Sequence, residues 1–283
     1  MTRDLVLFGD CRERLKEFDD LARMCITSPP YYGLRNYGDK DNQIGIEQTP
    51  EDYVNELVKV FREVKNNLTE DGTLWLNIGD SYYNYRSDGN YPKQTVSKTN
   101  QDLPSFSPVR GNKLEGYKSK DLIGIPWLLA FALRKDGWYL RQDIIWNKPN
   151  PMPESVRDRC TKSHEYIFLF SKSKNYYFDV DAIKEPTVDG KGLKRKKSVW
   201  TVNTKPYKDA HFAVYPPELI EPCIKSGSQK GDIILDPFMG SGTTGMVAKS
   251  LGRYYIGCEL HESYGKLIQK RVSEYTINLE DFV

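Results

Sequence analysis

Apolar residues in the first third of the chain alternate between short continuous runs and a longer helical stripe. The runs at 5–8 and 24–27 are too short for helices and predict buried strands. Segment 49–52, Thr-Pro-Glu-Asp, is typical of a helix start, because proline suits the first turn and acids suit the positive end of the helix dipole. A turn at 71–72 is then expected to lead into a strand at 73–80. The stripe after the helix start comprises Tyr53, Leu57, Val60, Phe61 and Val64.

The second half of the chain repeats this alternation. We predict a helix within 121–137, a strand within 138–149, and a hairpin over 164–179 that turns at 172–174. Residues 231–260 read as a strand, a glycine-rich turn, a helix and another strand. Strands that alternate with helices are typical of a parallel sheet with crossover helices, so the fold class is α/β.

Two stretches interrupt the pattern without ending the domain. Residues 81–118 are rich in Ser, Asn, Tyr, Gly and Pro and have no helical period, which predicts a mobile insertion loop. Residues 180–210 form a second irregular region. We therefore expect a single domain over 1–283 with two inserted segments.

Composition argues against a disulfide-rich secreted protein, a zinc protein and a membrane-spanning protein. The formal net charge of +2 does not by itself indicate a nucleic-acid partner. The 5 cysteines are scattered and the 3 histidines lack zinc-ligand spacing, so we expect reduced thiols and no metal. The amino terminus carries no secretory signal, and the longest apolar stretch, 124–133, covers about half of a bilayer span. We expect a cytoplasmic protein without a membrane partner.

A glycine turn carries the first chemical signal. Gly240, Gly242 and Gly245 follow an apolar run and precede a helix, and Glu259 ends the next strand, where an acid that binds ribose hydroxyls is expected. This pattern fits any cofactor with an adenosine, NAD included, and the lack of a Gly-Lys-Ser/Thr sequence excludes a P-loop. A turn that serves only strand–helix packing is the alternative.

Asp236 narrows the choice of cofactor. A carboxylate at the strand end would repel a pyrophosphate that approaches the helix amino terminus. It would suit an ammonium or sulfonium group instead. S-adenosylmethionine carries both groups, with a ribose for Glu259 and no phosphate, so the sequence favours it over NAD.

Two motifs together closely resemble the amino-methyltransferases of DNA, which methylate exocyclic nitrogens. They are TSPPY at 27–31 and DPFMGSGTTG at 236–245. Here Ser-Pro-Pro-Tyr precedes the cofactor turn, which is the permuted order of the family's β group, and the resemblance extends from Gly9 to Glu259. It implies a Rossmann-like S-adenosylmethionine-dependent fold with circularly permuted motif order and inserted recognition loops.

The resemblance implies roles for the residues of the first motif. Ser28 would accept one hydrogen bond from the target amino group and the Pro29 carbonyl would accept the other, which aims the nitrogen lone pair at the methyl donor. Tyr31 would stack on a base flipped out of the duplex, and Pro29 and Pro30 would form a rigid rim. Serine in the first position favours cytosine N4 as the target. Adenine N6 stays the alternative, since serine-containing members that act on adenine are known.

Cofactor contacts also follow from the resemblance. Asp10 would contact the adenine, with helix capping as the alternative. Phe212 would cover the methionine part, with a core position as the alternative. Thr243 would contact the cofactor carboxylate, with capping of the next helix as the alternative. The implied cofactor-binding residues are Asp10, Thr27, Phe212, Asp236, Pro237, Phe238, Gly240, Gly242, Thr243 and Glu259.

Double-stranded DNA is the implied substrate, bound through the candidate target-recognition region at 180–210. A basic cluster in that region can neutralise phosphates, although such a run is often only a solvated surface. Asn147 and Lys148 leave a strand in a proline-stiffened segment and would line the target-base side. The cluster consists of Lys194, Arg195, Lys196 and Lys197.

The resemblance further implies a prokaryotic or phage-encoded protein, a cognate restriction endonuclease as partner, and a homodimer. From the residues themselves, three other functions stay open. They are a nicotinamide-dependent oxidoreductase, a DNA-binding module without catalysis, and a methyltransferase that acts on RNA.

Overall fold

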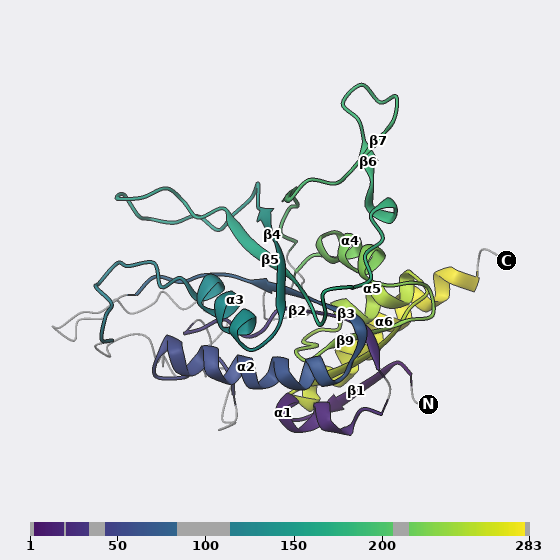
Figure 1. The fold of residues 1–283 in the computed structure, drawn as a ribbon, viewed down its shortest axis with the longest axis horizontal. Coiled ribbons are helices and arrows are strands. Elements are labelled where there is room, and N and C mark those ends of the chain that lie inside the picture. The colour runs from purple at the N-terminus through teal and green to yellow at the C-terminus, as the bar shows by residue number, and fades with distance from the viewer. Residues whose placement is uncertain (1–2, 20, 34–42, 84–113, 206–214, 281–283) are drawn as a thin grey trace.

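An eight-stranded sheet forms the centre of the molecule (Figure 1). The computed structural model describes residues 3–19, 21–33, 43–83, 114–205 and 215–280. The strands lie in the order β1, β10, β9, β2, β3, β5, β4, β8. Their bounds are β1 Leu5–Phe8, β2 Ala22–Thr27, β3 Leu68–Ile78, β4 Tyr139–Asn147, β5 His164–Ser171, β8 Val199–Thr201, β9 Ile233–Asp236 and β10 Tyr254–Glu259.

The direction of the strands decides where a ligand can bind. β5 runs antiparallel to both of its neighbours, β3 and β4, and every other pair in this sheet is parallel. The carboxyl ends of all strands except β5 therefore meet at one edge of the sheet, where β5 begins. Open α/β sheets bind their ligands at this edge.

Helices cover both faces of the sheet (Figure 1). Side chains alternate between the faces along each strand, so Cys25 packs on the side of α2 and α3, whereas Met24 and Ile26 pack on the side of α4, α5 and α6. Burial on both faces explains why the central strands read as continuous apolar runs. The helix bounds are α1 Cys11–Arg14, α2 Pro50–Asn66, α3 Ile125–Lys135, α4 Pro217–Gly227, α5 Thr243–Ser250 and α6 Gly265–Glu280, with 3₁₀ turns at Leu15–Glu17, Asp181–Ile183 and Glu262–Tyr264.

The start of α2 confirms the predicted helix signal. Thr49 is the N-cap and its hydroxyl accepts a hydrogen bond from the Asp52 amide at 3.0 Å, with Pro50 in the first turn. All five apolar positions of the predicted stripe are buried. Local capping and helical periodicity therefore agree with the packing of this helix.

The predicted turn at 71–72 is wrong. Asp71 and Gly72 lie inside β3, where the pairing with β2 shifts in register between Ala22 and Met24. A Cβ at Gly72 would lie 2.9 Å from the Thr69 carbonyl oxygen, so the irregularity leaves room only for glycine. The glycine thus permits a bulge instead of a chain reversal.

The predicted hairpin at 172–174 is also wrong. β5 ends at Ser171, and its hairpin partner is β4, which precedes it. The aromatic residues after the lysines pack on the sheet face instead of pairing as a strand; Phe178, for example, stacks on Trp75 with ring centroids 6.2 Å apart. The segment predicted as the second strand of the hairpin therefore serves packing.

Regular structure replaces part of the predicted irregular region at 180–210. β6 (Glu185–Pro186) and β7 (Leu193–Lys194) form a two-stranded ribbon that projects from the body of the protein (Figure 1). Segment 198–202 attaches the region to the domain through β8, which pairs with β4.

Most of the predicted mobile loop, 84–113, lies outside the described residues. In the described part of the chain, no helix is both long and apolar enough to cross a membrane.

Candidate active site

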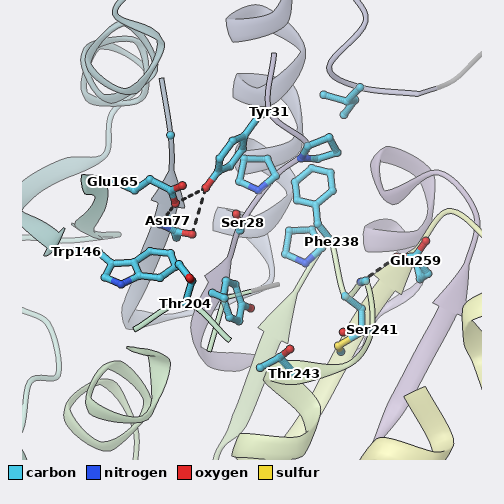
Figure 2. Close-up of a pocket in the computed structure, with 18 of the residues that line it drawn as sticks. Ser28, Tyr31, Asn77, Trp146, Glu165, Thr204, Phe238, Ser241, Thr243 and Glu259 are labelled. Atoms are coloured by element: carbon cyan, nitrogen blue, oxygen red, sulfur yellow. Dashed lines mark hydrogen bonds between the residues drawn. The ribbon is translucent and has the colours of Figure 1, made fainter. Parts of the chain in front are cut away.

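A cavity of about 940 Å³ opens at the sheet edge where the strands end (Figure 2). Residues that follow β1, β2, β3, β4, β8, β9 and β10 line it, together with the first residues of β5. Such a volume suits a nucleoside-sized cofactor together with a second small group. The residues predicted for chemistry that do line it are Asp10, Ser28, Pro29, Pro30, Tyr31, Lys148, Pro237, Phe238, Gly240, Thr243 and Glu259.

The exit of β2 is held rigidly at one side of this cavity. The Tyr53 hydroxyl donates a hydrogen bond to the Pro30 carbonyl at 2.7 Å, which fixes the double-proline turn on α2. Tyr32, by contrast, is 1% exposed and packs in the core, so only one of the two adjacent phenol rings faces the cavity. Ser28 and Tyr31 thus stand on a stiff support.

A polar network surrounds the Tyr31 ring (Figure 2). Its hydroxyl donates to Glu165 Oε2 at 2.7 Å, and the Asn77 amide donates to the same oxygen at 3.3 Å. Glu165 Oε1 accepts from the Lys148 ammonium, which also lies 4.1 Å from the centre of the Trp146 ring. Burial, followed by the charge of Glu165, raises the pKa of Tyr31 well above its usual value, so this phenol stays protonated and acts as a donor.

The glycine turn forms another wall of the cavity. Gly240 and Gly242 adopt φ of 53° and 84°, which other residues rarely do. The Gly240 and His261 amides donate to the two carboxylate oxygens of Glu259, each at 2.9 Å. Burial raises the pKa of Glu259 to about 7 despite these hydrogen bonds. Glu259 is therefore a carboxylate whose acceptor capacity changes near neutral pH.

Asp236 does not face the cavity, contrary to the argument that placed its charge beside a cationic ligand. Its carboxylate is 1% exposed and accepts hydrogen bonds from Thr27 Oγ1 at 2.6 Å, the Phe238 amide at 3.0 Å and the Tyr215 hydroxyl at 3.2 Å. Thr244 Oγ1 donates to it as well. Asp236 and Thr27 thus tie the exits of β9 and β2 together below the cavity floor.

Gly242 is also not among the residues that line the cavity. It is the N-cap of α5, and a Cβ there would lie 3.1 Å from Ile268 Cγ2 on α6. Its place in the turn therefore provides close helix packing and the required positive φ, while Gly240 provides the wall.

Thr243 and Asp10 test the alternatives that the sequence left open. Thr243 does not cap α5; its hydroxyl is buried, has no hydrogen-bond partner among the described residues, and lies at the cavity. A buried hydroxyl without a partner fits a site that a polar ligand completes. Asp10 does cap α1 by accepting from the Arg12 amide at 2.9 Å, and it also lines the cavity.

The predicted DNA-binding residues separate into two groups. Lys148 lines the cavity, whereas neighbouring Asn147 is not among the lining residues and bonds to Thr201 at 3.2 Å. The basic cluster at 194–197 lies on the β6–β7 ribbon and the segment that leads to β8, away from the cavity lining. Phe212 lies outside the described residues.

Sequence reasoning did not single out Asn77 or Glu165. Asn77 had a signal, because it stands near the carboxyl end of a predicted strand, where parallel sheets place ligands. Glu165 had none, since it lies at the start of a strand that only the structure shows to run antiparallel. No group of three or more His, Cys, Asp or Glu side chains in the described regions could hold a metal ion.

The fold and the cavity define a Rossmann-like α/β protein with a ligand-sized cavity at the ends of its parallel strands. The family model described as DNA methylase matches residues 22–270, so the chain belongs to this family, whose members methylate N6 or N4 amino groups. The predicted family and the predicted methyltransferase fold are both confirmed.

Individual relatives agree with this assignment. The chain is 51% identical over 269 residues to the Type II methyltransferase M.SmaI of Serratia marcescens, covering 94% of this chain and 90% of the relative. It is 48% identical over 272 residues to M.Cfr9I of Citrobacter freundii, covering 96% and 88%. Among solved structures, the PvuII DNA methyltransferase (cytosine-N4-specific) gives a TM-score of 0.68 at 18% identity, covering 98% of this chain and 91% of that one. The crystal structure of the M1.HpyAVI–SAM complex gives a TM-score of 0.59 at 19% sequence identity, covering 95% of this chain and 98% of that one.

Proposed function

We propose that this protein is a site-specific DNA methyltransferase that transfers the methyl group of S-adenosylmethionine to the exocyclic N4 of a flipped cytosine. One observation carries the proposal: Ser28 and Tyr31 line the same cavity as Gly240, Thr243 and Glu259. A base acceptor and a cofactor-type wall therefore face each other across one space. The partner endonuclease and the homodimer stay predictions.

The cofactor wall offers groups that suit S-adenosylmethionine. Glu259 can accept hydrogen bonds from ribose hydroxyls, the Thr243 hydroxyl can bond the cofactor's carboxylate, and Phe238 supplies an apolar surface in the cavity. Asp10 can accept from the adenine amino group. When bound, the cofactor supplies an activated methyl group, so the protein needs no covalent nucleophile and acts by positioning.

Cofactor affinity is expected to depend on pH through Glu259. Its pKa of about 7 lies above the ordinary glutamate pKa of 4.5. Between these two values the folded enzyme keeps a proton that the unfolded chain has lost, so the stability that this group contributes falls as pH rises. Ribose hydroxyls need the carboxylate as acceptor, so binding tightens as pH rises through 7. We expect the Kd for S-adenosylhomocysteine to be about tenfold higher at pH 6 than at pH 8. Titration calorimetry measures this difference and the proton released.

Glu259→Gln serves as the control for this pH dependence. The amide cannot ionise, so its weaker binding should be equal at both pH values. A wild-type affinity that does not change between pH 6 and 8 contradicts the assignment of Glu259 to the ribose.

The base side of the cavity supports an amino-group acceptor and cytosine in particular. Ser28 Oγ and the Pro29 carbonyl can accept the two amino hydrogens, and the Tyr31 ring offers a stacking surface for an extruded base. The ammonium groups of Lys148 and Lys162 also line the cavity. Cytosine presents an O2 acceptor to such donors, whereas adenine carries only C2–H at that side. Serine in the first motif position supports cytosine independently.

Nucleoside mass spectrometry tests the proposal directly. Plasmid DNA is incubated with the protein and S-adenosylmethionine, digested and analysed for modified bases. N4-methylcytosine is the expected product. N6-methyladenine would keep the enzyme class and overturn the choice of base, and a lack of any methylated deoxynucleoside would overturn DNA as the substrate.

The β6–β7 ribbon and the segment after it are proposed to contact DNA phosphates. The ammonium nitrogens of Lys194 and Lys196 lie 3.7 and 3.8 Å from the carboxylate oxygens of Glu185. Among the ion pairs of the described residues, none involves Arg195 or Lys197. We expect Arg195→Ala/Lys197→Ala to reduce the slope of log affinity against log salt by about 2, since each lost phosphate contact removes about 0.9. Fluorescence anisotropy at several salt concentrations measures the slope.

Arg134→Ala/Lys135→Ala is a matched control for the ribbon. It removes two exposed cations from the end of α3 and should leave the slope unchanged. Equal slopes for the wild type and the ribbon variant would remove this segment from the DNA interface.

A further inference from the structure

Glu165 joins three elements of the base side of the cavity (Figure 2). Its carboxylate accepts from Tyr31 after β2, from Asn77 on β3 and from Lys148 after β4, while Glu165 itself stands on β5. The side chains of Glu165 and Lys148 are each 16% exposed. A largely buried charge with three donors has a fixed position and forces each donor to point toward it.

The Tyr31 ring is fixed at a second point. A Cβ on Gly79 would lie 2.7 Å from Tyr31 Cε2 and 3.4 Å from Glu165 Cδ, so the ring packs directly on the backbone at the end of β3. The ring cannot swing away while its hydroxyl is bonded to Glu165. Tyr31 therefore has both its plane and its hydroxyl direction set by neighbours.

The direction of the Tyr31 hydroxyl matters for Ser28. The single hydroxyl proton of Tyr31 is directed to Glu165 Oε2 at 2.7 Å, with Asn77 Oδ1 as a more distant acceptor at 3.4 Å. Toward a group on its other side, such as Ser28, the Tyr31 oxygen therefore acts as an acceptor. Ser28 stands on the same rigid turn as Tyr31, lines the same cavity, and its side chain lies on the side of the Tyr31 hydroxyl (Figure 2). A serine hydroxyl can either donate or accept, and a target amino group requires it to accept.

We propose that Glu165 is a positioning residue that, through Tyr31, turns the Ser28 hydroxyl into a hydrogen-bond acceptor for the target amino group; this inference rests on the proposed methyl transfer. In the proposed arrangement Glu165 accepts from Tyr31 and Tyr31 accepts from Ser28, so the lone pairs of Ser28 stay available to the target amino group. This series of hydrogen bonds explains how a neutral hydroxyl, which could donate or accept, acts only as an acceptor toward the target amino group. Glu165 also lines the cavity, but the role proposed for it is exerted through Tyr31.

A double-mutant cycle tests whether Glu165 acts through Tyr31. Tyr31→Phe keeps the stacking ring and removes the hydroxyl, and Glu165→Gln keeps the shape and removes the charge. Each change should lower kcat about 10- to 100-fold, with KM for DNA and the Kd for S-adenosylhomocysteine within about twofold of wild type. Both substitutions interrupt the same series of hydrogen bonds. The kcat of the double variant should therefore be no lower than that of the slower single variant.

Several outcomes would overturn the inference. Multiplicative effects in the double variant would mean that Glu165 acts independently of Tyr31, and a Glu165→Gln variant with wild-type kcat would remove its role. Wild-type protein that methylates no DNA would overturn the proposed function and this inference with it. In contrast, failure of the inference alone leaves wild-type methylation intact.

Two further variants guard against a merely structural explanation. Glu165→Gln leaves the Lys148 charge without its partner, and Glu165→Gln/Lys148→Met restores charge balance. This double variant should unfold at about the wild-type temperature, which separates the loss of kcat in Glu165→Gln from a loss of structure. Recovery of kcat in that variant would overturn the inference. Glu221→Gln makes the same change in an exposed ion pair with Lys225 on α4 and should retain wild-type kcat.

Discussion

Replacement of Ser28 by alanine is expected to lower kcat for methyl transfer by about 10²- to 10³-fold, the loss typical when a preorganised hydrogen-bonding group is removed from a reacting atom. The change removes the acceptor that orients the amino nitrogen toward the methyl donor. Pro29, Pro30 and the Tyr53 hydrogen bond that fixes the turn remain in place. The measurement is single-turnover methylation with tritiated S-adenosylmethionine.

Binding measurements separate this effect from loss of structure. The Ser28→Ala variant should bind S-adenosylhomocysteine and DNA within about twofold of wild type, because neither the glycine turn nor the ribbon changes. Ser173→Ala removes an exposed hydroxyl that bonds the Asn175 carbonyl and should leave kcat unaltered. A Ser28→Ala enzyme that retains more than half of the wild-type rate would show that Ser28 does not orient the base.

Replacement of Asp236 by alanine is expected to reduce the free energy of unfolding by about 3–5 kcal/mol. The change leaves the Thr27 hydroxyl, the Thr244 hydroxyl and the Phe238 amide without their acceptor in a buried place. It also breaks the link between the exits of β2 and β9, so the cavity floor should loosen and S-adenosylhomocysteine binding should be lost. Urea unfolding followed by circular dichroism measures the stability.

Asp189→Ala provides a contrast with the same chemical change. Asp189 is exposed in the turn of the ribbon, where it accepts from Thr187 Oγ1 at 2.6 Å, and its loss should change the free energy of unfolding by less than about 0.5 kcal/mol. If Asp236→Ala also lowers the free energy of unfolding by less than about 1 kcal/mol, the hydroxyl and amide groups around it find new partners. The Asp236 carboxylate then does not stabilise the connection between the ends of β2 and β9.

Periodic patterns made most of the fold predictable. The helix that Thr49 caps and the strand–turn–helix around Gly240 depend on local capping, spacing and positive φ, which a sequence displays directly. Predictions failed where the same glycine or the same run of apolar residues is compatible with two different local structures. Gly72 permits a bulge instead of a turn, and Phe178 packs on Trp75 instead of continuing a hairpin.

Motif chemistry likewise located both walls of the cavity but not their internal contacts. The sequence by itself determined that Ser28–Tyr31 and the glycine turn each follow a strand, and their joint resemblance to the DNA amino-methyltransferases predicted that they share one site. Only the tertiary structure decided that Asp236 turns inward and that Glu165 holds Tyr31. The physical reason is that a side chain's direction depends on the donors packed around it. Residues 134 or 209 positions apart in the chain supply the partners for these two carboxylates, and no local pattern records them.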